Sequence, residues 1–100
     1  MNILAGHAVD YRYDAEAKEF KPAATVADGP TFTVRCLDYW QAQAVLDQST
    51  DAVKRIRLAL ETGLASIDGD AAKVKEFLDH PRATLVNPLF DAILQLASGN

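Results

Sequence analysis

The chain has 100 residues, of which 49% are hydrophobic and 24% are charged, and its formal net charge is −4. This size and balance are typical of a small globular domain and not of a disordered segment, so we expect residues 1–100 to form a single domain. The acidic balance, without a run of Lys and Arg residues, argues against a nucleic-acid-binding protein.

Neither a membrane span nor a signal peptide is predicted. No window approaches 18 uninterrupted apolar residues, and the N-terminal segment 1–5 carries no Lys or Arg. The chain has one cysteine, Cys36, which excludes an internal disulfide and a metal cluster built on thiolates. We therefore expect a cytoplasmic protein without a membrane partner.

An antiparallel hairpin is predicted at about residues 8 to 21. Val9, Tyr11 and Tyr13 alternate with charged residues, which is the period of a half-buried strand. The polar residues 14–18 can turn the chain back into a short second strand.

The clearest strand signal lies at residues 31–37. Phe32, Val34 and Cys36 point to one face, and Arg35 lies with threonines on the other. Three interpretations of Arg35 stay open: a solvated side chain, an ion pair with an acidic residue of the next helix, or a contact with a partner, because arginine is enriched at interface hot spots.

From residue 38 onward the spacing of apolar residues becomes helical, so residues 1–37 are predicted to be mainly β and 38–98 mainly α. Asp38 and Gln41 fit a capping box that opens a short helix ending near Asp47. The predicted fold class is α+β, with an N-terminal antiparallel hairpin or small sheet followed by three or four helices. The expected core comprises Phe32, Val34, Trp40, Leu46, Val53, Ile56, Leu60, Phe77, Leu89 and Ile93.

The longest predicted helix covers about residues 50–66, with Ser49 or Thr50 as its cap. Its apolar residues recur at spacings of three and four and share one face. These residues are Val53, Ile56, Leu60, Leu64 and Ile67. Gly63 costs a helix about 1 kcal/mol relative to Ala, which indicates close packing at that position.

Two further helices are predicted after the turn at residues 68–70. The first lies near residues 72–78 and is stopped by His80-Pro81. The last starts either near Arg82 or at Asn87-Pro88, and it ends at Ser98-Gly99.

The last helix is apolar around most of its circumference. Leu85, Leu89 and Ile93 share one face, and Phe90 and Leu94 lie about 100° further round. Such a helix is either central to the core or offers a second face to another chain. We expect one face to pack on the helix at 50–66 and the other to dock a partner or a second copy of this chain. The candidate partner-binding residues are Arg35, Leu85, Leu89, Phe90, Ile93 and Leu94.

No catalytic apparatus is predicted. His7 and His80 lack ligands at helical spacing, and Cys36 lies on the expected buried face of its strand. The turn at residues 68–70 resembles the start of a calcium loop, but the twelfth position is Asp79 instead of glutamate. We therefore expect a protein that is not an enzyme and that has no metal or other cofactor.

The order of elements resembles the small tail assembly chaperones of long-tailed bacteriophages. The matching segments are Pro30 to Leu37, Gly63-Leu64, Ile67-Asp68-Gly69 and the helix at 85–96, so the resemblance covers residues 30–97 and leaves out the hairpin. It implies a non-enzymatic factor that coats the tape measure protein in the infected cell, recruits tail tube subunits and self-associates.

Two other functions stay open. A small structural tail or head protein of the virion would use the hairpin and the strand at 31–37 to add to a neighbour's sheet. A small host-directed inhibitor would mimic a nucleic-acid surface, although a net charge of −4 is modest for that role.

Overall fold

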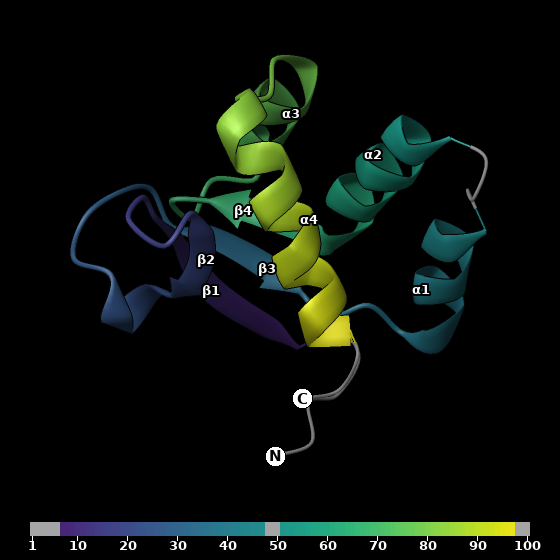
Figure 1. Cartoon of the computed structure of the whole chain (residues 1–100), viewed down its shortest axis with the longest axis horizontal. Coiled ribbons are helices and arrows are strands. Elements are labelled where there is room, and N and C mark those ends of the chain that lie inside the picture. The colour runs from purple at the N-terminus through teal and green to yellow at the C-terminus, as the bar shows by residue number, and fades with distance from the viewer. Residues whose placement is uncertain (1–6, 48–50, 98–100) are drawn as a thin grey trace.

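The computed structural model describes residues 7–47 and 51–97, which form an antiparallel sheet with helices on one of its faces (Figure 1). The strands are β1 (Ala8–Asp14), β2 (Glu19–Pro22), β3 (Phe32–Arg35) and β4 (Leu64–Ile67), in the spatial order β2-β1-β3-β4. The helices are α1 (Tyr39–Leu46), α2 (Ala52–Gly63), α3 (Ala72–Asp79) and α4 (Ala83–Ala97), with a short 3-10 helix η1 (Ala23–Thr25). The predicted α+β fold class is confirmed.

The predicted hairpin is present, and its turn is held by one carboxylate. Asp14 accepts hydrogen bonds from the backbone N–H groups of Glu16 and Ala17, and its other oxygen lies 3.0 Å from Lys21 Nζ. Lys18 takes the left-handed conformation, with φ of 57°, that returns the chain into β2.

The strand predicted at 31–37 becomes β3, and it lies inside the sheet. It pairs with β1 on one side and with β4 on the other, so β2 and β4 are the edge strands. The predicted alternation holds: Phe32 and Val34 are buried, while Arg35 is exposed. Because both sides of β3 are already paired, it cannot add to a neighbour's sheet as the virion-protein hypothesis required.

Strand β4 corrects the predicted helix at 50–66. Helix α2 ends at Gly63, and Leu64 and Ile67 then pair with Val34 and Phe32. Residues three apart point to opposite faces of a regular strand, but a register shift opposite Thr33 and Val34 inserts one extra residue here. Both Leu64 and Ile67 therefore reach the core, and their spacing of three residues belongs to a bulged strand and not to a helix.

The caps of the first two helices are aspartates. Asp38 Oδ1 accepts the Gln41 N–H at 2.8 Å, and Gln41 Oε1 accepts the Asp38 N–H at 2.9 Å, which confirms the predicted capping box. Helix α2 is capped by Asp51, which accepts hydrogen bonds from the N–H groups of Val53 and Lys54. The predicted caps Ser49 and Thr50 lie outside the described residues.

Helix α3 ends before His80-Pro81 as predicted, and α4 begins at Ala83, near the earlier of its two predicted starts. Pro88 therefore lies inside α4, where its ring removes one backbone donor. Burial of Leu85 and Leu89 on either side of it favours the longer helix. The predicted end at 98–99 lies outside the described residues.

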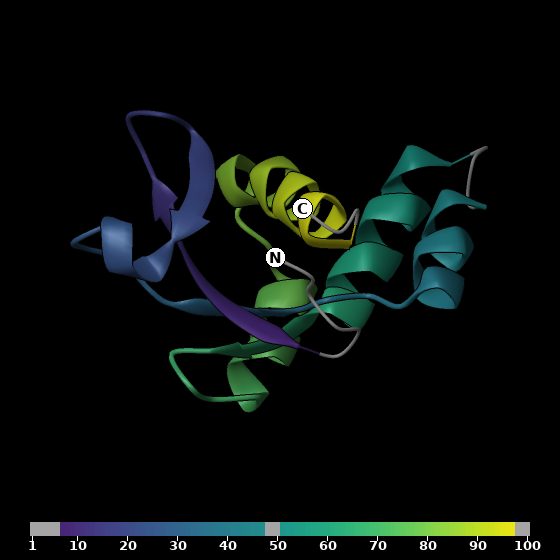
Figure 2. The same ribbon diagram turned by 90° about the horizontal axis from the view of Figure 1, so that it is seen from below.

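The core lies between the sheet and the helices. The rings of Phe20, Phe32 and Phe77 form a chain of edge contacts, with centroid separations of 5.2 and 5.6 Å, that joins β2, β3 and α3. Helix α4 lies between the hairpin and α2, and α1 lies beyond α2 at the outer end (Figure 2).

Part of the predicted core is wrong. Phe32, Val34, Leu60, Leu89 and Ile93 are buried as expected. Ile56 and Phe77 are half-buried, but Trp40, Leu46 and Val53 are 77%, 47% and 74% exposed. The exposed residues belong to the α1–α2 segment, because α1 sits at the edge of the molecule and buries only Val45.

Candidate functional site

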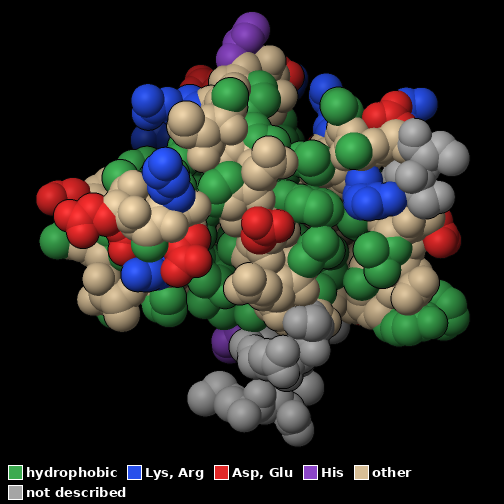
Figure 3. Space-filling model, viewed as in Figure 1, with side chains coloured by type: hydrophobic (Ala, Val, Ile, Leu, Met, Phe, Trp, Pro, Cys, Tyr) green, Lys and Arg blue, Asp and Glu red, His purple; other side chains and the backbone are tan. Residues whose placement is uncertain are grey.

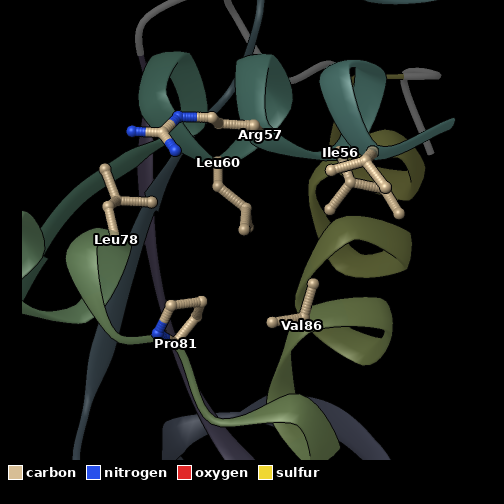
Figure 4. Close-up of a pocket in the computed structure, with 7 residues that line it drawn as sticks. Ile56, Arg57, Leu60, Leu78, Pro81 and Val86 are labelled. Carbon is tan, nitrogen blue, oxygen red and sulfur yellow. The ribbon is translucent and has the colours of Figure 1, made fainter. Parts of the chain in front are cut away.

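An apolar groove with a volume of about 200 Å³ opens between α2, α3 and α4. Its lining consists of Val53, Ile56, Arg57 and Leu60 from α2, Leu78 from α3, Pro81, and Val86 from α4. In Figure 4 the side chains from the three elements converge on a common space, with Leu60 and Val86 facing each other across it. We call this set the α2–α4 groove.

The α2 wall of the groove follows from helical spacing. Val53, Ile56 and Leu60 lie three and four residues apart and so share one side of the helix. Leu60 is buried and forms the floor, while Val53 is exposed and forms the rim. The apolar stripe predicted for this helix therefore faces the core at one end and solvent at the other.

Arg57 is the charged residue in the groove lining. Its Nε–H donates to Glu61 Oε1 at 2.7 Å, and both side chains are largely exposed. Such an exposed pair one helical turn apart contributes only about 0.3–0.5 kcal/mol to stability. The other guanidinium N–H groups bond no described residue, and the head group lies on the Leu78 side of the groove (Figure 4).

Helix α4 extends the apolar surface beyond the groove. Val86 lines the groove, and Phe90 and Leu94 follow one and two turns later on the same side of the helix. All three side chains are half-buried. Figure 3 shows hydrophobic side chains on this face of the molecule between α4 and α2, and again over α1.

The candidate residues of α4 divide as their angular spacing predicts. Leu85, Leu89 and Ile93 are buried in the core, where they contact the chain itself and are closed to a partner in this fold. Phe90 and Leu94 lie on the second face and remain half accessible. Only these two of the five α4 candidates are available for docking.

Arg35 is not part of this surface. It points to the opposite, solvent face of the sheet and makes no ion pair with any described residue. Its neighbours on that face form two separate hydrogen-bonded pairs: Arg12 Nε donates to Thr31 Oγ1 at 3.1 Å, and the Thr33 hydroxyl donates to Asp10 at 2.7 Å. The structure therefore separates Arg35 from the α4 candidates.

Sequence reasoning missed an exposed aromatic pair on α1. Tyr39 and Trp40 are 66% and 77% exposed, and their rings meet edge to face at 5.1 Å. Helix α1 contains no charged residue. The adjacency of two large aromatics was the available signal, because neighbouring positions on a helix lie about 100° apart and a short helix at the edge of the fold buries only a narrow stripe.

Within the ranges 7–47 and 51–97, no group of three or more His, Cys, Asp or Glu side chains could hold a metal ion. Cys36 is buried, and burial raises the pKa of its thiol. None of the helices in the described part of the chain is long and apolar enough to cross a membrane.

Comparison with protein-family models, with curated proteins and with solved structures finds no match to this chain.

Proposed function

We propose that this protein is a non-enzymatic assembly factor that binds another protein through the α2–α4 groove. The observation that carries the proposal is the lining of the groove, in which six apolar side chains surround a single cation. Contiguous apolar patches larger than a few hundred Å² are rare on monomeric proteins and mark interaction sites. The exposed Tyr39 and Trp40 add to the argument, because both residue types are enriched at interface hot spots.

The resemblance over residues 30–97 favours one kind of assembly factor, a phage tail assembly chaperone. In this proposal the protein acts in the cytoplasm of the infected cell. There it binds the tape measure protein and recruits tail tube subunits. The acidic balance of the chain and its accessible apolar surface support this role.

Self-association is part of the same proposal. A second copy of the chain would cover Phe90 and Leu94, which are half-buried on the outer side of α4. Analytical ultracentrifugation at high micromolar concentration tests it. A monomer under these conditions would remove self-association from the proposal and leave hetero-association through the groove.

Co-expression with the tape measure protein encoded beside this chain tests the chaperone role. We expect the tape measure protein to become soluble with the wild-type chain and to stay insoluble with Val53→Glu, which places a carboxylate at the groove rim. Ala24→Glu is the control, because Ala24 is exposed and does not line the groove. Equal insolubility with and without the wild-type chain would refute the chaperone role.

Among the described strands, the virion-protein alternative retains the edge strands β2 and β4 as sites for sheet addition. Strand β2 is short, ends in Pro22 and carries Lys21, features that discourage edge pairing. Mass spectrometry of purified virions separates the alternatives, because an assembly chaperone is absent from the finished particle and a structural protein is present.

A further inference from the structure

The connector between β2 and β3 arches over β1 and is held at its base by Arg12. The β1–β2 ladder and the β1–β3 ladder meet at Tyr11, so the connector has to cross only one strand. The Arg12 guanidinium donates to Val26 O at 2.9 Å through Nη1 and to Thr31 Oγ1 at 3.1 Å through Nε. The arch is therefore anchored just before and just after its apex.

The apex itself, residues 27–30, has no such anchor. None of these residues forms a hydrogen bond or an ion pair with another described residue, and all of them are exposed. The loop that follows η1 lies at the edge of the molecule, away from the helices (Figures 1 and 2). A Cβ atom at Gly29 would meet no other atom within 4 Å. The described chain therefore leaves both space and conformational freedom around the bond between Asp28 and Gly29.

An Asp-Gly sequence can rearrange without a catalyst. The glycine backbone nitrogen attacks Cγ of the aspartate, a C–N bond forms, and the carboxyl OH leaves as water with the amide proton, which gives a five-membered succinimide. Water then opens the ring at one of its two carbonyls. Opening at the former side-chain carbonyl restores aspartate, whereas opening at the backbone carbonyl gives isoaspartate, in which the chain runs through Cγ and is longer by a CH₂ group. Glycine favours the reaction because it has no Cβ atom to obstruct the attack.

The chain contains a second Asp-Gly sequence at residues 68 and 69, and hydrogen bonds restrain it. Asp68 Oδ1 accepts the Thr31 N–H at 2.8 Å, and the Asp68 N–H donates to Thr31 O at 2.7 Å. Ile67 and Asp70 exchange both of their backbone hydrogen bonds, which closes a tight turn around this sequence. Attack by the Gly69 nitrogen would have to break the carboxylate bond to Thr31 and distort the turn.

We propose that Asp28-Gly29 is the site at which this protein isomerises to isoaspartate, and that the hydrogen bonds of Asp68 protect Asp68-Gly69. Space beside the glycine does not distinguish the two sites, because a Cβ atom at Gly69 would also meet no atom within 4 Å. A hydrogen bond to a carboxylate is among the stronger ones, and the need to break it slows the attack by roughly tenfold or more. The inference goes beyond the proposed function and does not depend on it, because residues 27–30 do not line the α2–α4 groove.

Ageing of the full-length protein at neutral pH in water enriched in heavy oxygen tests the proposal. Trypsin, used afterwards in ordinary water, releases residues 19–35 and 58–73 as separate peptides with one Asp-Gly sequence each, because Lys21 precedes proline and is not cut. Passage through the ring introduces a heavy oxygen, and chromatography coupled to mass spectrometry separates the isoaspartyl peptide from the aspartyl peptide. We expect isoaspartate to accumulate at least about tenfold faster in 19–35 than in 58–73 in the native protein.

Unfolded protein and one variant are the controls. In urea the two peptides should age at comparable rates, because the hydrogen bonds of Asp68 are lost. Asp28→Glu keeps the charge at this exposed position and should abolish isomerisation in 19–35, because its longer side chain would have to form a six-membered ring. Equal rates in the native protein, or faster isomerisation at Asp68, overturn the proposal. Isoaspartate that forms in 19–35 in urea but not in the native protein overturns it as well, because the apex would then be restrained.

Discussion

The contact between Gly63 and Ile93 gives the sharpest test of this structure. Gly63 ends α2 where α4 crosses it, and a Cβ atom at residue 63 would lie 2.9 Å from Ile93 Cγ2. Two further side-chain atoms of Ile93 would lie 3.2 Å away, whereas carbon atoms pack best at about 3.5–4.0 Å. Ile93 is fully buried and β-branched, so it cannot easily turn away.

Two opposing effects set the result of Gly63→Ala. Overpacking of a buried contact costs about 1–3 kcal/mol. Alanine gains up to about 1 kcal/mol over glycine in a helix interior, and less at the last helical residue. We therefore expect a net destabilisation of about 1–2 kcal/mol. For a chain of this size, each 1 kcal/mol lowers Tm by about 4–8 °C.

Urea unfolding of four proteins measures this effect: the wild type, Gly63→Ala, Ile93→Ala and the double variant. Ile93→Ala alone is expected to cost about 2–5 kcal/mol, because it leaves a cavity in the core. It also removes all three atoms that a new Cβ would approach. In that background Gly63→Ala should be neutral or stabilising by up to about 1 kcal/mol.

The cost of Gly63→Ala in the wild type and in Ile93→Ala shows whether the two positions are coupled. An equal cost of Gly63→Ala with and without the Ile93 side chain would mean that the two positions are not coupled. Stabilisation by Gly63→Ala in the wild-type background would show that helix propensity outweighs packing here. Either result would refute the predicted destabilisation by overpacking between Gly63 and Ile93.

Four further predictions concern other parts of the fold. Asp38→Ala removes the capping box of α1 and should cost about 1 kcal/mol in chemical denaturation. Trp40, the single tryptophan, should be quenched by acrylamide nearly as efficiently as free tryptophan, and shielding in the monomer would contradict its exposed position. Burial raises the pKa of the Cys36 thiol, so the thiol should react slowly with Ellman's reagent at neutral pH until urea unfolds the chain. The thiol of the unfolded chain ionises at a lower pH than the buried thiol, so the free energy of unfolding should fall as pH rises above about 8.5. The hydrogen bond from Lys21 lowers the pKa of the Asp14 carboxyl. The contribution of this carboxylate to stability is therefore present above about pH 4 and is lost as pH falls through the folded-state pKa. An NMR titration should show the lowered pKa of Asp14, and Lys21→Gln should return that pKa towards its ordinary value.

Local signals in the sequence were enough to predict two strands, one helix cap and the two faces of α4. Alternation of apolar and polar residues predicted β1 and β3, because successive side chains of a strand point to opposite faces. The capping box at Asp38 depends on residues only three apart, so it is readable without the fold. The angular division of α4 also came from helix geometry, and it correctly separated Leu89 and Ile93 from Phe90 and Leu94.

Only the tertiary structure decided which apolar residues are buried and where the surface opens. Leu64 and Ile67 have a helical spacing in the sequence, but they lie in strand β4, which contains one extra residue. They pair there with Val34 and Phe32, which are distant in the sequence. Val53 and Trp40 are apolar, but too few elements surround the α1–α2 segment to cover them. The groove joins α2, the end of α3 and the start of α4, so its shape and the position of Arg57 within it depend on long-range packing. Hydrophobic periodicity reports the face that a segment can bury, whereas the neighbours available in space determine how much of that face is covered.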